Sequence, residues 1–174
     1  MAGLIPPTSG PISAVSIPVL LGVSAAMRPN LTGRENIFLG SSALGLKRGE
    51  IASQIEDVIE FSGIRDSIDH PFRTYSSGMK ARLQFAVSTS VRPRILLVDE
   101  ALAVGDEEFR HRSNDRVQEL VDGASTVLLV SHSLATISER CDKALWLDGG
   151  RPVMWGAGSE VANAYRADIA ERTA

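Results

Sequence analysis

Two short apolar runs, each followed directly by polar side chains, constrain the fold of this chain more than any other feature of its sequence. Residues 95–98 (Ile-Leu-Leu-Val) lead into Asp99 and Glu100, and residues 126–130 (Thr-Val-Leu-Leu-Val) are followed within two residues by His132. Runs of this length and composition are typical of strands that are buried on both faces of a parallel sheet. A helical pattern lies between them, and strands that alternate with helices predict an α/β fold.

Capping and turn signals divide the rest of the chain into short elements. Thr32 and Glu35 form the S/T-x-x-E pattern of a capping box. Asp148-Gly149-Gly150 is a hairpin turn signal. The sequence predicts helices over residues 32–44, 47–61, 106–121, 134–140 and 159–172 and from Ser77 onward, and strands over residues 13–23, 95–98, 126–130, 144–147 and 151–155.

Composition excludes several classes of protein. The 174 residues are 44% hydrophobic and 22% charged, which is the composition of one globular domain. The single cysteine, Cys141, excludes an internal disulfide framework and a cysteine-based zinc cluster. A net charge of −3 and an aromatic content of 5% argue against a nucleic-acid partner. The apolar stretch 11–27 is interrupted by Pro18 and Gly22, so we expect no membrane-spanning helix.

Polar side chains follow both predicted central strands at the edge where open α/β folds bind ligands. Adjacent residues on a strand point in opposite directions, so Asp99 and Glu100 are suited to different roles. One carboxylate can reach Mg²⁺, and the other can orient or deprotonate a water molecule. His132 would lie at the same edge if the strands are parallel, where it could contact a phosphate oxygen. The alternative is that these are ordinary polar residues at strand ends.

Small residues precede the predicted helix at Ser77, in the run Tyr75-Ser76-Ser77-Gly78-Met79. The free N–H groups at a helix N-terminus form an anion site, and glycine lets a phosphate approach the backbone closely. The alternative is a simple serine cap. Between Gly78 and Asp99, and again between Glu100 and His132, there is room for one helix and one strand.

In this order, YSSGM, ILLVDE and LLVSHS resemble the ATP-binding subunits of ABC transporters. The resemblance covers nearly the whole chain. It identifies YSSGM with the signature motif that contacts the ATP of a partner subunit, although Tyr75 and Met79 depart from the commoner LSGGQ. It implies that Asp99 holds Mg²⁺ through water, that Glu100 and His132 are catalytic, and that Asp106 belongs to the D-loop.

The segments LTGRENIFL, TYSSGMKARLQFAVST and LLVDEALAVGDEEFR resemble one group of these subunits more closely. That group drives export of O-antigen, teichoic acid and related lipid-linked glycans. The usual Q-loop glutamine is absent, and only Pro29 remains of the G-x-G-F-x-P stretch typical of the group. The resemblance implies strand remnants over residues 1–31, a helical signature subdomain over 32–91, a catalytic α/β core over 92–157 and a terminal helix over 158–174.

The sequence contains no phosphate-binding loop of the form G-x-x-x-x-G-K-[ST], known as Walker A. None of its three lysines, Lys47, Lys80 and Lys143, follows a glycine. We therefore expect Met1 to lie just after the P-loop helix of the family. We also expect the isolated chain neither to bind ATP tightly nor to hydrolyse it, because the P-loop amides and lysine hold the phosphates.

The resemblance implies ATP and Mg²⁺ as cofactors in intact members of the family. The partners it implies are a second ATP-binding subunit and a membrane permease, with the protein peripheral on the cytoplasmic face of the inner membrane. Two alternatives stay open. The chain could be a non-catalytic partner that dimerises with a complete subunit, or a soluble ABC ATPase that is not linked to transport.

Overall fold

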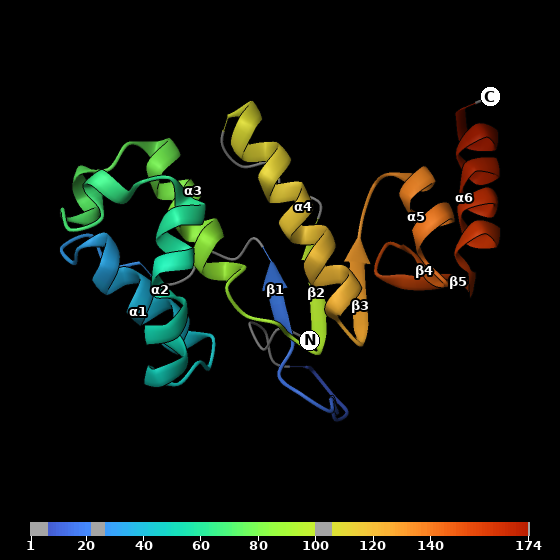
Figure 1. The fold of residues 1–174 in the computed structure, drawn as a ribbon. Coiled ribbons are helices and arrows are strands. Elements are labelled where there is room, and N and C mark those ends of the chain that lie inside the picture. Colours follow the sequence, from blue (N-terminus) through green and yellow to red (C-terminus); the bar gives the residue numbers. More distant parts are fainter. Residues whose placement is uncertain (1–6, 22–26, 100–105, 174) are drawn as a thin grey trace. The chain divides into compact units, whose positions relative to one another are not determined.

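The structure is a computed structural model that describes residues 7–21, 27–99 and 106–173 (Figure 1). The chain divides into two compact units, Met1–Leu129 and Val130–Ala174. No helix in the described ranges is both long enough and apolar enough to cross a bilayer.

Three helices pack together in the first unit. They are α1 (Gly33–Ala43), α2 (Arg48–Ser62) and α3 (Ser77–Ser88), and two 3₁₀ turns, Arg65–Ser67 and Phe72–Thr74, connect α2 to α3 (Figure 1). All three helices were predicted from the sequence and are confirmed. Their shared core is apolar and contains Ile37, Val58, Ile59, Ile64, Ile68, Phe72, Tyr75, Leu83, Ala86 and Val87.

The capping box at the start of α1 is also confirmed. The Glu35 N–H donates to Thr32 Oγ1 at 3.2 Å, and the Thr32 N–H donates to Glu35 Oε2 at 2.8 Å. The two side chains thereby satisfy N–H groups that have no partner inside the helix, which fixes where α1 begins.

The same unit contains a three-stranded sheet in the order β1-β2-β3. Its strands are β1 (Val19–Leu21), β2 (Ile95–Asp99) and β3 (Thr126–Val130). β1 runs parallel to β2, with Val19 opposite Leu96. Helix α4 (Glu107–Gly123) covers one face of this sheet (Figure 1). The apolar side chains that pack together there are Leu21, Leu96, Val98, Val117, Leu120, Val121, Val127 and Leu129. The prediction of an α/β fold with a parallel sheet is confirmed.

Two predictions about strands require correction. The strand predicted over residues 13–23 is limited, in the described part, to β1, and Val15 and Ile17 before it are 80% and 86% exposed. Pro18 limits pairing there because proline has no N–H to donate. β3 was predicted to be buried on both faces, but Leu128 and Val130 are 39% and 67% exposed. Only the Val127 and Leu129 face is packed under α4, so β3 alternates in exposure although its sequence is continuously apolar.

The second unit is built on an antiparallel hairpin. β4 (Lys143–Asp148) pairs with β5 (Arg151–Ala157) through the predicted glycine turn, where Gly149 and Gly150 have φ values of 54° and 76°. Helices α5 (Leu134–Arg140) and α6 (Gly158–Thr173) complete the unit. Trp146 of β4 packs edge-on against Tyr165 of α6, with ring centroids 5.2 Å apart. These four elements confirm the predictions for this part of the chain.

Candidate functional site

The N-terminus of α3 is open to solvent. Ser76 is the N-cap, and its Oγ accepts from the Met79 N–H at 3.2 Å. Ser77 and Gly78 are exposed, and a Cβ added to Gly78 would meet nothing closer than Ser76 Oγ at 4.0 Å. N–H groups in the first turn of a helix have no intrahelical acceptor, and the helix dipole makes this end positive. The first turn of α3 is therefore accessible to an anion.

A lysine adds positive charge one turn into α3. The Lys80 ammonium lies 5.8 Å from the centre of the Phe72 ring. Its backbone N–H donates to the Ser76 carbonyl at 3.0 Å, as expected for the first regular turn after the cap. Cation–π contact with Phe72 orients the side chain without neutralising it, so the charge remains available near the helix end.

Tyr75 and Met79 are less exposed to solvent than the three residues between them. The side chain of Tyr75 is buried, and its hydroxyl donates to the Ser67 carbonyl at 2.7 Å. Burial raises the pKa of the Tyr75 phenol above its ordinary value. Met79 packs partly against the helical core. Of the five residues predicted to face a partner's nucleotide, Ser76, Ser77 and Gly78 are therefore the exposed ones.

Asp99 is the exposed end of a buried strand. The four preceding residues of β2 are buried, whereas Asp99 itself is exposed at the carboxyl end of the strand. The adjacent Glu100, predicted to be catalytic, lies outside the described residues, so the predicted pairing of the two carboxylates stays a prediction.

Asp106 connects the start of α4 to α3. It is the N-cap of α4, and its Oδ1 accepts from the Phe109 N–H at 3.0 Å. Its other oxygen forms an ion pair with Arg82 of α3, whose guanidinium also stacks over the Phe109 ring. The Phe109 N–H and then Arg82 hold the pKa of Asp106 below its usual value. Arg82 was not among the predicted site residues, because only the fold brings α3 and α4 together.

His132 lies in the second unit, in the turn between β3 and α5. It is exposed. The serines on either side organise the turn, because the Ser133 N–H donates to Ser131 Oγ at 3.0 Å and Ser133 caps α5. That His132 shares a sheet edge with Asp99 remains a prediction.

Asp99, at the carboxyl end of β2, fits Mg²⁺ only as one ligand among several. No group of three or more histidine, cysteine or acidic side chains in the described ranges is placed to hold a metal ion. Mg²⁺ in phosphoryl-transfer sites commonly has one or two carboxylates, with phosphate oxygens and water completing its octahedron. The exposed Asp99 fits that arrangement as a single carboxylate.

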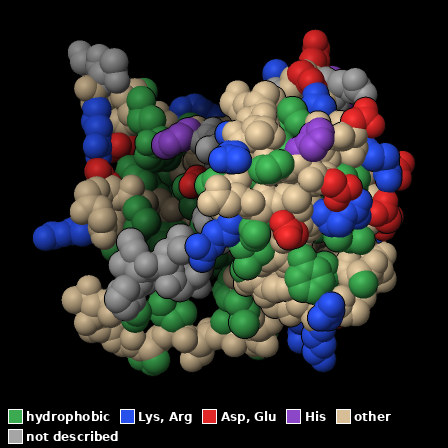
Figure 2. All heavy atoms as spheres, turned by 90° about the vertical axis from the view of Figure 1, so that its left-hand side faces the viewer, with side chains coloured by type: hydrophobic (Ala, Val, Ile, Leu, Met, Phe, Trp, Pro, Cys, Tyr) green, Lys and Arg blue, Asp and Glu red, His purple; other side chains and the backbone are tan. Residues whose placement is uncertain are grey.

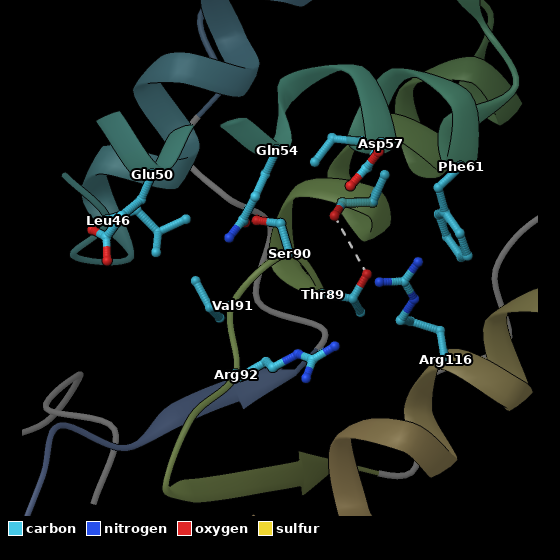
Figure 3. Close-up of a pocket in the computed structure, with 12 residues that line it drawn as sticks. Leu46, Glu50, Gln54, Asp57, Phe61, Thr89, Ser90, Val91, Arg92 and Arg116 are labelled. Carbon is cyan, nitrogen blue, oxygen red and sulfur yellow. Dashed lines mark hydrogen bonds between the residues drawn. The ribbon is translucent and has the colours of Figure 1, made fainter. Parts of the chain in front are cut away.

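A cavity of about 460 Å³ lies elsewhere in the first unit, between α2, the residues after α3, and α4 (Figure 3). Gln54 and Asp57 approach it from α2, whereas Arg92 and Arg116 approach it from the opposite side. The Gln54 Oε1 atom is buried and has no hydrogen-bond partner among the described residues. None of the predicted site residues appears among those that line this cavity.

Charge on the molecular surface is mixed. On the face shown in Figure 2, acidic and basic side chains lie side by side. One exposed network joins Arg34 to Glu56 and Asp69 and joins Arg65 to Glu56, which ties α1, α2 and the first 3₁₀ turn together. These charges therefore pair with one another within the helical part of the unit.

A parallel sheet with helices packed on it places the chain among the open α/β domains, a class in which ligands generally bind at the carboxyl ends of the strands. The sequence profile of the family described as ABC transporter matches residues 3–103. The chain belongs to that family.

Relatives with assigned functions match nearly the whole chain. It is 42% identical over 170 residues to the O-antigen export system ATP-binding protein RfbB of Myxococcus xanthus. The matched region covers 97% of this chain and 39% of that protein. It is 41% identical to the teichoic acids export ATP-binding protein TagH of Lactococcus lactis, covering 95% and 35%. It is 37% identical to RfbB of Klebsiella pneumoniae, covering 98% and 70%. The chain thus spans little more than a third of the first two relatives.

Solved structures support the fold. An ATP-binding subunit of an ABC transporter superimposes with a TM-score of 0.64 at 21% identity, covering 85% of this chain and 62% of that one. A dimeric ATP-binding cassette with bound ADP and phosphate gives a TM-score of 0.55 at 18% identity, covering 80% and 62%. At these identities the likeness shows the fold alone.

Proposed function

We propose that this chain acts in an ABC transporter as an ATP-binding subunit that drives export of a polysaccharide or lipid-linked glycan. The observation that carries this proposal is the open N-terminus of α3, with Ser76, Ser77 and Gly78 exposed in the same compact unit as Asp99. The glycan class rests on relatives named for O-antigen and teichoic acid export, each matched over at least 95% of this chain.

In this proposal the α3 N-terminus completes an ATP site whose phosphate-binding loop belongs to a partner subunit. The free N–H groups of Ser77 and Gly78 would bind phosphate oxygens, and Gly78 leaves room for their approach. Mg²⁺, when bound, neutralises charge on the phosphates. In the head-to-tail arrangement that the family resemblance implies, Ser77 and Gly78 face the partner's nucleotide. At the subunit's own nucleotide, Asp99 would hold the ion through water, Glu100 would polarise the attacking water, and His132 would contact the γ-phosphate.

Two partners follow from this role. A second ATP-binding subunit supplies the opposing phosphate-binding loop, and a membrane permease provides the path for the glycan. The chain would then be a peripheral protein on the cytoplasmic face of the inner membrane.

The 174-residue chain alone is proposed to be inactive as an ATPase. Its three lysines lie outside any G-x-x-x-x-G-K-[ST] pattern, and two copies would present two signature helices to each other without a loop that holds phosphate. A calorimetric titration of this chain with Mg·ATP is expected to show no binding at micromolar concentrations. Micromolar affinity would contradict the proposal.

The second candidate, a non-catalytic partner of a complete subunit, predicts in addition that this chain raises the ATPase activity of that subunit.

The export role can be tested in the source organism. Deletion of the gene is expected to remove the long-chain glycan from the cell surface and to leave lipid-linked glycan inside the cell. The wild-type gene should restore it, and a gene carrying Asp99→Asn should not. Unchanged surface glycan in the deletion strain would contradict a role in export.

A further inference from the structure

Tyr75 is buried and makes several contacts, although the exposed N-terminus of α3 begins at the next residue. Its side chain is only 4% exposed, and its hydroxyl donates to the Ser67 carbonyl at 2.7 Å. Its ring centre lies 5.4 Å from that of Phe72, and its own N–H donates to the Phe72 carbonyl at 3.1 Å. The next residue, Ser76, is the cap of α3. A buried, hydrogen-bonded group thus lies one residue from the accessible turn.

Gly33 makes room for the Tyr75 hydroxyl. A Cβ on Gly33 would collide with that hydroxyl, and it would also lie 2.8 Å from Ile68 Cδ1 and 2.9 Å from the Ile68 carbonyl oxygen. Gly33 is the first residue of α1. The absence of a side chain at this position therefore lets the start of α1 approach the phenol.

The segment that accepts the Tyr75 hydrogen bond is itself attached to α1. The Gly33 N–H donates to the His70 carbonyl at 3.3 Å, and the Arg34 N–H donates to the Ile68 carbonyl at 3.1 Å. The Arg34 guanidinium also pairs with Asp69 at 2.9 Å. These contacts hold residues 67–70 against the start of α1, so the hydrogen bond from Tyr75 connects the residue before α3 to a segment that is attached to α1.

We propose that Tyr75 is a positioning residue, which sets the location of the α3 N-terminus through Ser67 and Gly33 and does not itself touch nucleotide. Its buried hydroxyl fixes the residue before the cap, and this in turn orients the exposed N–H groups of Ser77 and Gly78. The value of this arrangement for ATP binding rests on the proposed function. The anchoring itself does not, and it can be tested without nucleotide.

The test is amide hydrogen exchange, followed by mass spectrometry on the full 174-residue chain at low concentration. Tyr75→Phe removes only the hydroxyl. Because a single hydrogen bond is lost, the amides of Met79 and Lys80, which both donate to Ser76, should exchange roughly fivefold to tenfold faster, while amides in the middle of α2 stay unchanged. Tyr165→Phe, which alters the other tyrosine of the chain, should leave the exchange of residues 76–80 unchanged. Equal acceleration across α1, α2 and α3, or no acceleration, would overturn the proposal.

A second variant, at Gly33, tests the contact between Tyr75 and the start of α1. Gly33→Ala should accelerate exchange of the Met79 and Lys80 amides because the new methyl group displaces the Tyr75 hydroxyl. Combined with Tyr75→Phe, it should add less than the sum of the two single effects, since the shorter side chain partly relieves the collision. Additive effects would show that Gly33 and Tyr75 act independently and would overturn the proposal.

The wild-type chain alone provides a test if Tyr75→Phe does not fold. The amides of Gly33, Arg34 and Lys80 should then open together, with the same dependence on low concentrations of urea. Independent opening of Lys80 would contradict the anchor. None of these results depends on ATP, so a failure of the anchor leaves the export proposal standing, and the reverse also holds.

Discussion

Asn36 organises the segment before α1 through a side chain that is fully buried. Its Oδ1 accepts from the Arg28 N–H at 2.6 Å, and its Nδ2 lies within hydrogen-bond distance of the carbonyls of Arg28, Leu31 and Thr32. A buried side-chain amide that forms hydrogen bonds with this many backbone groups contributes strongly to the free energy of unfolding, because each group would otherwise be buried without a partner. Asn36 could not be singled out from the sequence, because nothing local distinguishes it from a surface asparagine.

Asn36→Asp is expected to lower the free energy of unfolding by about 3 kcal/mol at neutral pH, because a carboxylate would replace a donor among carbonyl oxygens. Urea unfolding measures the change. Asn163→Asp, at an exposed position of α6, is the control and should cost less than about 0.5 kcal/mol. Equal effects at the two positions would contradict the role of Asn36.

Asp106 is expected to make stability depend on acid. Its pKa is lower in the folded chain than in the unfolded chain, because Phe109 and Arg82 favour the carboxylate. The resulting stabilisation is therefore present above the ordinary aspartate pKa and is lost as the pH falls. Asp106→Asn keeps a capping oxygen but removes the charge, so the loss of stability toward low pH should become shallower. Urea unfolding between pH 3 and pH 7 measures this, with Asp115→Asn on the same helix as the control; an unchanged slope for Asp106→Asn would contradict the assignment.

At the scale of elements, local signals predicted the helices well. The helix starts at Thr32, Ser76, Asp106 and Ser133 each carry a side chain that caps the first turn, and such pairs lie within three residues of each other in the sequence. The approach of Gly33 to Tyr75 and the pairing of Arg82 with Asp106 join residues that are far apart in the sequence. No local pattern encodes them.

The exposure of β3 was mispredicted for a similar reason. An apolar run indicates a strand, but it does not show which of the strand's faces other elements cover. Only the face under α4 is packed in the described structure, so Leu128 on the opposite side stays exposed. Burial is a property of the assembled layers, and the strand's own composition does not determine it.

The first turn of α1 offers a direct test of a local signal. Thr32→Ala removes one half of the capping box and should lower the free energy of unfolding by about 1 kcal/mol. Thr32→Ser keeps the accepting oxygen and should recover most of that loss. Thermal or urea unfolding of the wild-type chain and the two variants measures this free energy. An equal loss of stability in Thr32→Ser and Thr32→Ala would show that the hydroxyl is not the origin of the stabilisation.

At the scale of the whole molecule, exposed apolar side chains gather on the hairpin of the second unit. Leu145 and Trp155 lie opposite each other on β4 and β5 and are 47% and 67% exposed. Contiguous exposed apolar surface of this kind favours association.

The isolated chain is expected to self-associate at concentrations of roughly tens of micromolar, and Trp155→Thr should reduce this while leaving the far-ultraviolet circular dichroism unchanged. Light scattering over a concentration series measures the effect. A wild-type chain that stays monomeric across the series would contradict the expectation.

The central claim is that the exposed turn of α3 completes an ATP site in an export complex, and two glycines test it directly. Gly78 and Gly49 are each the second residue of a helix, and a side chain at either position would enter open space. The measurement is ATP turnover by the native membrane assembly that contains this chain. Gly78→Asp is expected to reduce turnover by roughly 100-fold or more, because the new carboxylate would repel phosphate, whereas Gly49→Asp should leave it unchanged. Full turnover with Gly78→Asp, in an assembly that contains the variant chain, would contradict the account.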